Sequence, residues 1–424
     1  MVKMKDSGIE WIGEIPEKWR VVPLYNYFSE RKNKNRAGNE RNLLSLSYGN
    51  IIRKNIEAKG GLLPESFTTY NVIEPGDIII RPTDLQNDKR SLRTGLSNER
   101  GIITSAYIDL APKSGANSRY YHYLLHSYDV QKVFYNMGNG VRQGLNYTEF
   151  SKLRVLVPER IEQSQITNFL DRKTTAIDRL IDKIYTEIDT LKQYQSSVIT
   201  QAVTKGLDLN VPMKDSGIEW IGEIPETWKT RKIKYYLNRN DIKNHPDEEV
   251  LSVYRDYGVV PKDSRNDNHN VTSNDTANYK YVVKGNLVIN KMKAWQGSMA
   301  VSNYTGIVSP AYYIYQFKNS SLNKRYFHYL IRNCYKDEFK RLSTGIRDGQ
   351  WDLQSYDFEN TIITLPSKDE QKRIADFVDV KISQIKKVIK FNQKQIKQLT
   401  EYKNSLIFEY VTGKKQVPQM EGRN

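Results

Sequence analysis

The chain has 424 residues, of which 38% are hydrophobic, and a formal net charge of +16. No stretch approaches the roughly 18 apolar residues that a membrane span needs. The single cysteine, Cys334, excludes a disulfide framework and fits a small residue on an amphipathic helix. The basic balance indicates a polyanionic partner, either nucleic acid or an anionic membrane surface. The start of the chain lacks the pattern of a signal peptide, so we expect a cytoplasmic protein.

One segment of the sequence occurs twice. Residues 4–19, MKDSGIEWIGEIPEKW, return at residues 213–228 with a single change, from Lys18 to Thr227. The offset of 209 residues is far longer than a solenoid or propeller repeat, so the repeated unit is a whole domain with its connector. Four further pairs of segments recur at offsets of 205 to 208 residues, namely 101–107 with 306–312, 119–124 with 325–330, 140–144 with 345–349 and 162–171 with 370–379.

Each half is expected to contain a mixed α/β globular region. Buried strands entered through a turn and amphipathic helices are predicted in both regions from hydrophobic runs and 3–4 spacing. The predicted segments are 72–80 and 282–289 for the strands, and 119–137 and 323–342 for the helices. Between the matching anchors the polar residues differ, which indicates one scaffold that presents two different surfaces.

A long helix with a heptad seam is predicted at the end of each half. The spacing of apolar residues alternates between four and three, as in a coiled coil. The residues predicted to pair the helices are Ile177, Ile181, Ile184, Ile188 and Leu191 in the first, and Ile385, Ile389, Asn392, Ile396 and Leu399 in the second. Each helix covers roughly 40 residues, or about 60 Å.

The ends of these helices carry their own signals. Ser367 and Glu370 form a capping box at the start of the second helix, and Gly206 and Gly413 follow the last turns. An antiparallel pair is the simplest arrangement and gives a pseudo-two-fold axis with one domain at each end. We expect each repeated tryptophan segment to pack near the end of the other repeat's helix. The polar seam residues either fix the register or face solvent, and they are Gln195, Asn392 and Lys403.

The predicted fold class is therefore mixed α+β, with two pseudo-two-fold-related globular domains separated by two long antiparallel coiled-coil helices. The boundaries place an N-terminal segment at 1–19, the first globular domain at 20–157, the first helix at 158–206, the repeated segment at 207–228, the second domain at 229–365, the second helix at 366–413 and a tail at 414–424.

Motifs for catalysis are missing from the sequence. There is no Gly-x-x-x-x-Gly-Lys-Ser/Thr loop for ATP and no Asn/Asp-Pro-Pro-aromatic tetrapeptide of the kind that amino-methyltransferases use. Residues 57–59 and 338–340 each match only the Glu-x-Lys end of a nuclease metal site, without the upstream Pro-Asp. His122 and His126 lie four apart on a predicted helix, but the second repeat has His328 and Arg332 there. We therefore expect no metal site and a protein that recognises rather than reacts.

The duplicated Ile-Glu-Trp-Ile-Gly-Glu-Ile-Pro-Glu-x-Trp segment and the doubled Glu-Gln-x-x-Ile helix starts, at 162–166 and 370–374, resemble the specificity subunit of type I restriction–modification systems. The resemblance covers essentially the whole chain. It implies two target recognition domains that each read one half of a split, asymmetric site in double-stranded DNA, with helices that set the spacer. It also implies binding of two methyltransferase and two restriction subunits, which supply adenine methylation from S-adenosylmethionine and Mg- and ATP-dependent cleavage. This chain itself would be non-catalytic and hold no cofactor.

Side chains near the tips of both domains are the candidates for DNA contact, because Lys and Arg hold phosphates while Asn, Gln, Arg and Asp read base edges. The candidates are Arg81, Asp84, Gln86, Asn87, Lys89, Arg90, Arg93 and Arg142 in the first domain, and Asn290, Lys291, Lys293, Trp295, Gln296, Arg347 and Gln350 in the second. Arg142 and Arg347 share a Gly-x-Arg-x-Gly pattern, in which glycine lets the backbone approach a phosphate.

An adaptor with a coiled coil is the alternative from another class, with basic domains that bind RNA or an acidic protein. Readers of single-stranded RNA usually present stacking aromatics on a sheet with a recognisable signature. No such signature is found in this sequence.

Overall fold

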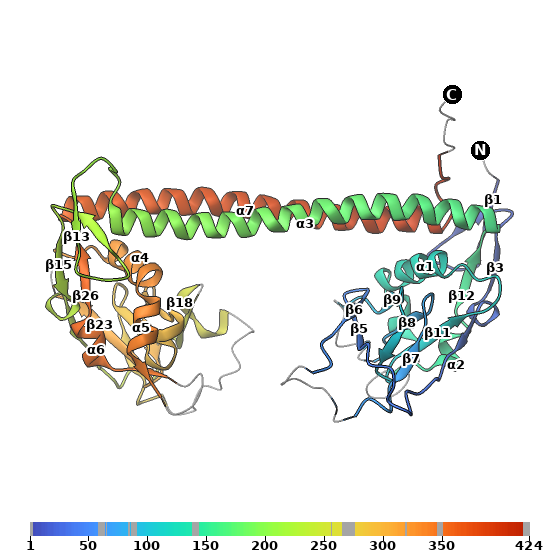
Figure 1. The fold of residues 1–424 in the computed structure, drawn as a ribbon, viewed down its shortest axis with the longest axis horizontal. Helices are drawn as coiled ribbons and strands as arrows, with labels where there is room; N and C mark the ends of the chain where they lie inside the picture. The colour runs from blue at the N-terminus through green and yellow to red at the C-terminus, as the bar shows by residue number, and fades with distance from the viewer. Residues whose placement is uncertain are drawn as a thin grey trace. The chain divides into compact units, whose positions relative to one another are not determined.

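The computed structural model in Figure 1 describes residues 3–57, 64, 66–83, 85, 91–137, 144–255, 257–264, 276–318, 320–345 and 351–418. The chain divides into two compact units. The first contains Met1–Ile184 and Gln393–Asn424, and the second contains Tyr185–Asn392. Both long helices pass from one unit into the other.

The first unit contains one copy of the globular fold. Its elements are β1 (Met4–Asp6), β2 (Glu14–Pro16), β3 (Arg20–Pro23), η1 (Leu24–Asn26), β4 (Phe28–Glu30), β5 (Leu44–Ser47), β6 (Asn50–Arg53), β7 (Asn71–Ile73), β8 (Ile78–Ile80), β9 (Thr94–Leu96), β10 (Gly101–Ile103), β11 (Ile108–Pro112), α1 (Ser118–Val130), η2 (Val133–Asn136), α2 (Tyr147–Phe150) and β12 (Arg154–Val157). Helix α3 (Arg160–Lys205) follows and continues into the second unit.

With a few additional short helices and strands, the second unit has a similar order of elements. They are β13 (Met213–Asp215), β14 (Glu223–Pro225), β15 (Lys229–Lys232), η3 (Ile233–Tyr235), β16 (Leu237–Arg239), β17 (Leu251–Tyr254), β18 (Gly258–Pro261), η4 (Lys262–Ser264), β19 (Lys280–Val282), β20 (Leu287–Asn290), η5 (Lys291–Gln296), β21 (Met299–Val301), β22 (Gly306–Val308), β23 (Tyr312–Phe317), α4 (Lys324–Cys334), α5 (Lys336–Leu342), β24 (Ser343–Thr344), β25 (Asp352–Leu353), α6 (Ser355–Asn360) and β26 (Ile362–Leu365). Helix α7 (Lys368–Val411) then returns to the first unit.

An antiparallel four-stranded sheet forms the centre of each globular domain. The strand order is β4-β11-β8-β9 in the first unit and β16-β23-β20-β21 in the second, so the two sheets are equivalent. Strand β8 is the run Ile78-Ile79-Ile80, and all three side chains are buried. Ile78 and Ile80 belong to the main core, whereas Ile79 packs in a smaller cluster with Leu44. The strand is apolar at every position because both of its faces are covered.

The predicted amphipathic helices exist but are shorter than expected. Helix α1 ends at Val130, and Lys132 takes a left-handed conformation with φ 62° before the short turn η2. In the second unit Tyr335 separates α4 from α5. Neither break contains the Gly or Pro that would have marked it, so the apolar spacing alone predicted one continuous helix in each place.

The two long helices pack in the predicted antiparallel sense. In the first unit the start of α3 shares a core with the end of α7, which includes Ile177 and Leu406. In the second unit the end of α3 shares a core with the start of α7, which includes Val203 and Ile374. Because each unit joins the start of one helix to the end of the other, the pair runs antiparallel in both.

The polar residues of the helix seam differ in their hydrogen bonds and burial. Lys403 donates to both carboxylate oxygens of Asp178 at 2.7 Å, so this lysine links the helices within the first unit. Asn392 is buried, and its amide nitrogen has no hydrogen-bond partner among the described residues. Gln195 is half-buried.

The second tryptophan of each repeated segment packs at the end of the other repeat's long helix, as predicted. The indole of Trp19 donates to Glu162 at 2.8 Å, and an added Cβ on Gly413 would lie 3.1 Å from the same ring. The indole of Trp228 donates to Glu370 at 3.0 Å and lies against Gly206. Gly413 and Gly206 have φ of 73° and 79°, so both helix ends use the left-handed residue that the sequence predicted.

Ser367 caps the start of α7 as predicted, because its hydroxyl accepts from the Glu370 backbone N–H at 3.3 Å, while the Glu370 carboxylate accepts from the Trp228 indole. Among the described residues, no helix is long and apolar enough to cross a bilayer.

Candidate nucleic-acid interface

The loop that follows the central strand is the first predicted contact region. In the first unit it leaves β8 at Arg81, whose side chain is half-buried, and returns to β9. The loop is tied down at both ends, because Arg81 donates its backbone N–H to the Arg93 carbonyl at 2.8 Å and Leu145 donates to the Pro82 carbonyl at 3.0 Å. Leu85 is buried beneath it.

Arg93 anchors this loop from inside the domain. Its side chain is fully buried, with 0% exposure. Nε donates to the Tyr135 hydroxyl at 3.2 Å, Nη1 donates to the Thr83 carbonyl, and the backbone N–H of Arg93 donates to Asp129. A guanidinium enclosed in this way supports the loop and does not reach a ligand, which corrects the assignment of Arg93 as a DNA contact.

Several electrostatic features surround this anchor. Burial raises the pKa of Asp129 to about 6, while the hydrogen bond from the Arg93 backbone opposes that rise. Lys132 lies over the Tyr135 ring at 4.6 Å and Arg93 over the same ring at 5.1 Å. The Tyr135 ring therefore makes cation–π contacts with both side chains where the loop meets the domain.

The equivalent loop of the second unit is the short helix η5, which follows β20. Asn290 caps it by accepting from the Met292 backbone at 3.2 Å. Lys291 bonds Asp352 at 3.1 Å, and the Trp295 ring packs on Trp351 with centroids 5.0 Å apart. These contacts hold η5 as a capped turn that directly follows β20.

The predicted DNA-contact residues of the second unit differ in solvent exposure. Lys293 is exposed, whereas Asn290, Lys291, Trp295 and Gln296 are half-buried. Lys293 is therefore the most accessible of these candidates, while Lys291 and Trp295 are partly committed to packing.

Several candidates lie outside the described residues: Asp84, Gln86, Asn87, Lys89, Arg90, Arg142, Arg347 and Gln350. Their DNA contacts stay predictions, as do those of the described candidates other than Arg93.

Burial of the helix-pairing residues follows the heptad pattern. Ile177, Ile188, Ile385 and Asn392 are buried, and the remaining members are half-buried, namely Ile181, Ile184, Leu191, Ile389, Ile396 and Leu399.

A hairpin that the sequence did not reveal stands beside the sheet in each unit. The hairpin of β5 and β6 turns at Tyr48 and Gly49, and Tyr48 has φ 46° and is 78% exposed. The hairpin of β17 and β18 presents Tyr257, which is 60% exposed. Exposed aromatic side chains at corresponding turns are suited to stacking on a ligand. The signal available was the Tyr48-Gly49 pair, since glycine next to a turn residue marks a hairpin.

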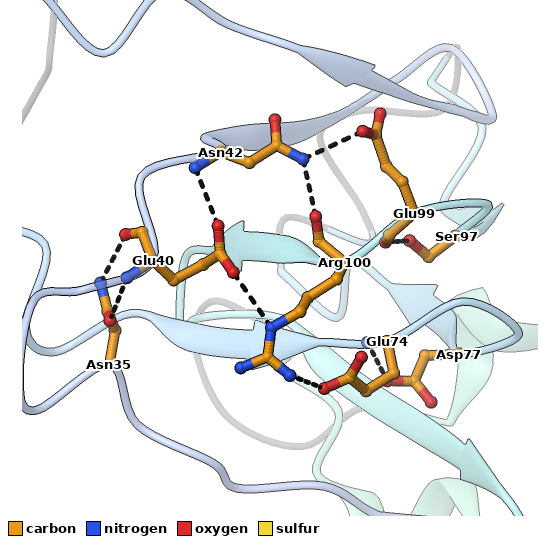
Figure 2. Close-up of polar contacts among 8 residues, drawn as sticks. All are labelled: Asn35, Glu40, Asn42, Glu74, Asp77, Ser97, Glu99 and Arg100. Atoms are coloured by element: carbon orange, nitrogen blue, oxygen red, sulfur yellow. Dashed lines mark hydrogen bonds and ion pairs between the residues drawn. The ribbon is translucent and has the colours of Figure 1, made fainter.

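Carboxylates around Arg100 link the segment that precedes β5 to the turns after β7 and before β10 (Figure 2). Arg100 lies between Glu40 and Glu74, at 3.0 and 2.5 Å. Asn42 donates to Glu99 at 3.0 Å and to the Arg100 carbonyl at 2.7 Å. The charge of Arg100 is therefore balanced within the domain, and this side chain is a structural fastener rather than a phosphate contact.

The histidine pair on α1 is built into the packing. His126 lies 3.3 Å from the Asn404 side chain of α7. Burial lowers the pKa of both histidines, that of His122 to about 3, so both are neutral near pH 7. Among the described residues, no group of three or more His, Cys, Asp or Glu side chains is arranged to hold a metal ion. Burial also raises the pKa of the Cys334 thiol to about 12.

The fold and the loops define a duplicated scaffold with two different candidate contact surfaces. The family model described as the type I restriction modification DNA specificity domain matches residues 225–410. The chain is 24% identical over 434 aligned positions to the type I restriction enzyme MjaVIII specificity subunit of Methanocaldococcus jannaschii, covering 96% of this chain and 95% of that protein. It is 25% identical over 240 positions to the putative MjaX specificity subunit of the same organism, covering 53% of this chain and 55% of that one.

A solved structure from work on complex assembly and conformational transition of the type I restriction–modification system shares the fold. It has a TM-score of 0.58 and 14% identity, and the match covers 94% of this chain and 99% of that one. The predicted resemblance to type I restriction–modification specificity subunits and the predicted fold class are both confirmed.

Proposed function

We propose that this DNA-specificity subunit reads a split, asymmetric site in double-stranded DNA, with one half of the site read by each unit. The observation that carries the proposal is the pair of equivalent sheets, β4-β11-β8-β9 and β16-β23-β20-β21, followed by unlike loops. The loop after β8 is held by the buried Arg93, whereas the loop after β20 is the helix η5. One scaffold with two different contact surfaces suits two different half-sites.

The helices set the unread gap between the half-sites in this proposal. Helix α3 runs for 46 residues and α7 for 44 without an interruption, and both keep a heptad seam. The exposed faces of these helices and the repeated tryptophan segments would recruit two methyltransferase subunits and two restriction subunits.

In this proposal the partner subunits carry out the methylation and cleavage reactions. They would use S-adenosylmethionine, ATP and Mg for adenine methylation and for cleavage, while this chain contributes recognition and no catalytic group. The proposal matches the sequence, which has no nucleotide-binding loop.

Exchange of one domain tests the two-reader proposal. Residues 20–157 are replaced by the corresponding region of a relative, and the chimaera is expressed with the methyltransferase subunit. Long-read sequencing of the methylated genome is expected to show one half of the motif changed and the other half kept. A motif in which both halves change, or in which neither does, contradicts the proposal.

A further inference from the structure

A cluster of polar side chains closes the neck of the loop after β8 in the first unit. Arg93, immediately before β9, is 0% exposed, and its guanidinium reaches back to the start of the loop, where it donates to the Thr83 carbonyl. Asp129, near the end of α1, is also 0% exposed and accepts the backbone N–H of Arg93. We call Arg93, Asp129, Lys132 and Tyr135 the loop clamp.

Helix α1 brings the clamp together, because it packs along β9 (Figure 1). The helix ends at Val130, and the left-handed conformation of Lys132, with φ 62°, redirects the chain. The Lys132 ammonium then lies 3.0 Å from the Tyr135 hydroxyl, to which Arg93 also donates at 3.2 Å. A side chain other than glycine keeps such a backbone conformation only where the surrounding contacts fix it. The clamp is therefore built from both α1 and the turn that follows it.

The second unit forms the same strand pairing with a small residue in place of Arg93. In the first sheet, Arg81 donates its backbone N–H to the Arg93 carbonyl at 2.8 Å. At the same place in the second sheet, Asn290 donates to the Ser298 carbonyl at 2.9 Å, so Ser298 corresponds to Arg93. A neutral side chain is therefore sufficient at this position of the scaffold.

The counterpart of Asp129 in the second unit is not an acid. The first tryptophan of each repeated segment contacts a tyrosine edge-on, Tyr128 in the first unit and Tyr335 in the second. These two tyrosines therefore correspond. Asp129 follows the first of them and Lys336 follows the second. The acid, like the arginine, is present in the first unit and replaced at the corresponding position of the second.

Burial of these charged groups costs free energy, and the shared scaffold does not require it. Burial raises the pKa of Asp129, while the hydrogen bond from the Arg93 backbone and the charge of Lys132 oppose that rise. The two units differ here in the connection itself, which is residues 82–92 in the first unit and the shorter 291–297 in the second. A longer connection loses more conformational entropy when it is held in one geometry. The clamp therefore serves the loop.

We propose that Asp129 is a positioning residue for recognition of the half-site read by the first unit. Because Asp129 is buried, it acts through Arg93, which fixes the neck of the loop so that the loop presents its side chains in one geometry. Base edges are distinguished by hydrogen bonds with a defined geometry, so a loosely held loop accepts more than one base. The proposal rests on the proposed function, in which the first unit reads one half of the DNA site.

The test compares two variants of the full chain, each purified in complex with the methyltransferase subunit. Asp129→Ala removes the acceptor of the Arg93 N–H. Val155→Ala is the matched control, because Val155 is also 0% exposed but lies on β12, which pairs with β3 and not with the strands that flank the loop. Both are assayed at the same interval below their own thermal midpoints, so that a general loss of stability affects them alike. Discrimination is the relative methylation rate of duplexes in which one base pair of the site is changed.

Asp129→Ala is expected to lower this discrimination roughly tenfold in the half-site that domain exchange assigns to the first unit, since a well-placed contact discriminates by about that factor or more. The other half-site is expected to keep the parental discrimination. Val155→Ala is expected to keep it in both half-sites. Parental discrimination in Asp129→Ala, an equal loss in both half-sites, or an equal loss in Val155→Ala overturns the proposal.

Hydrogen exchange tests the clamp in the absence of DNA. Amides of Arg81, Thr83 and residues 91–95 are expected to exchange faster in Asp129→Ala than in the parent, whereas Val155→Ala should keep the parental rates there. Unchanged exchange in Asp129→Ala contradicts the clamp itself. A parental complex that methylates DNA without sequence preference contradicts the proposed function instead, so the two failures are distinguishable.

Discussion

At the scale of single residues, Arg93 holds the loop after β8 through hydrogen bonds that a lysine cannot reproduce. Its planar guanidinium donates in two directions, to Tyr135 and to Thr83. Arg93→Lys keeps the charge but loses this pair of hydrogen bonds and leaves the Thr83 carbonyl and the Tyr135 hydroxyl without this donor. We expect a loss of roughly 2 kcal/mol in the free energy of unfolding, or about 4–8 °C in the thermal midpoint.

Arg36→Lys, at an exposed position of the same domain, is the matched control and is expected to leave the midpoint unchanged. Differential scanning fluorimetry makes both measurements. Equal midpoints for the two variants would mean that Arg93 does not anchor the loop.

Asp109 is expected to make stability depend on pH. It is 1% exposed on β11, and its carboxylate oxygens accept no hydrogen bond among the described residues. Burial and the neighbouring Asp77 raise its pKa from 3.8 to about 8, while Arg31 opposes the rise. Between those two values the folded state holds a proton that the unfolded state releases. The contribution of Asp109 to stability is therefore greatest below pH 4 and falls as pH rises toward 8.

Asp109→Asn mimics the protonated carboxyl and removes this dependence. We expect the variant to exceed the parent in thermal midpoint by more at pH 8 than at pH 5. Asp337→Asn, at an exposed position, should give the same difference at both pH values. A constant difference for Asp109→Asn would contradict the assignment.

At the scale of elements, the glycine that ends α7 is required for two reasons, its left-handed backbone conformation and its close contact with Pro16. Gly413 has φ 73°, and an added Cβ would lie 2.4 Å from Cδ of Pro16. Gly222 has a similar φ of 66°, but an added Cβ would meet nothing within 4 Å. The backbone cost of alanine is therefore alike at the two positions, at about 1–2 kcal/mol, while the steric cost belongs to Gly413 alone.

Gly413→Ala is expected to lower the thermal midpoint clearly more than Gly222→Ala does. Because Pro16 is rigid and buried beside Trp19, the clash is relieved only by moving the end of α7 away from the repeated segment. Hydrogen exchange at residues 14–19 should rise in Gly413→Ala and stay at the parental rate in Gly222→Ala. Similar effects of the two variants would show that this close approach contributes nothing.

Elements were predictable from the sequence where the signal was local. The heptads of α3 and α7, the cap at Ser367 and the terminal glycines all act within a few residues, and the structure confirms them. The break after α1 was not predictable, because Lys132 adopts its left-handed conformation without a Gly or Pro to mark it. The burial of Arg93 was hidden for a different reason, since its partner Tyr135 lies 42 residues away.

At the scale of the whole molecule, the repeat predicted more than any single motif. Two copies of one segment implied two copies of one fold, and the equivalent sheets of the two units follow from it. The repeat could not predict how the copies diverge. At equivalent positions of the two long helices, for example, Asp178 bonds Lys403 in the first unit, whereas the second helix has Lys386.

The proposed spacing role of the helices makes the last prediction. Inserting one heptad after Leu191 and one after Leu399 preserves the seam, because the apolar positions recur every seven residues. Each insertion lengthens its helix by about 10 Å. DNA rises about 3.4 Å per base pair, so the unread gap in the methylated motif is expected to grow by roughly three base pairs.

The same change also rotates one half-site against the other by about a third of a turn, which is expected to weaken activity because each reader must still face the groove. The measurement is the methylated motif, read by long-read sequencing in cells that also express the methyltransferase subunit. Seven residues inserted after Asn210, in the exposed segment that follows α3, leave both helices at their parental length and should keep the parental gap. If the double heptad variant methylates DNA with the parental gap, the helices do not set the spacing and serve only to assemble the complex.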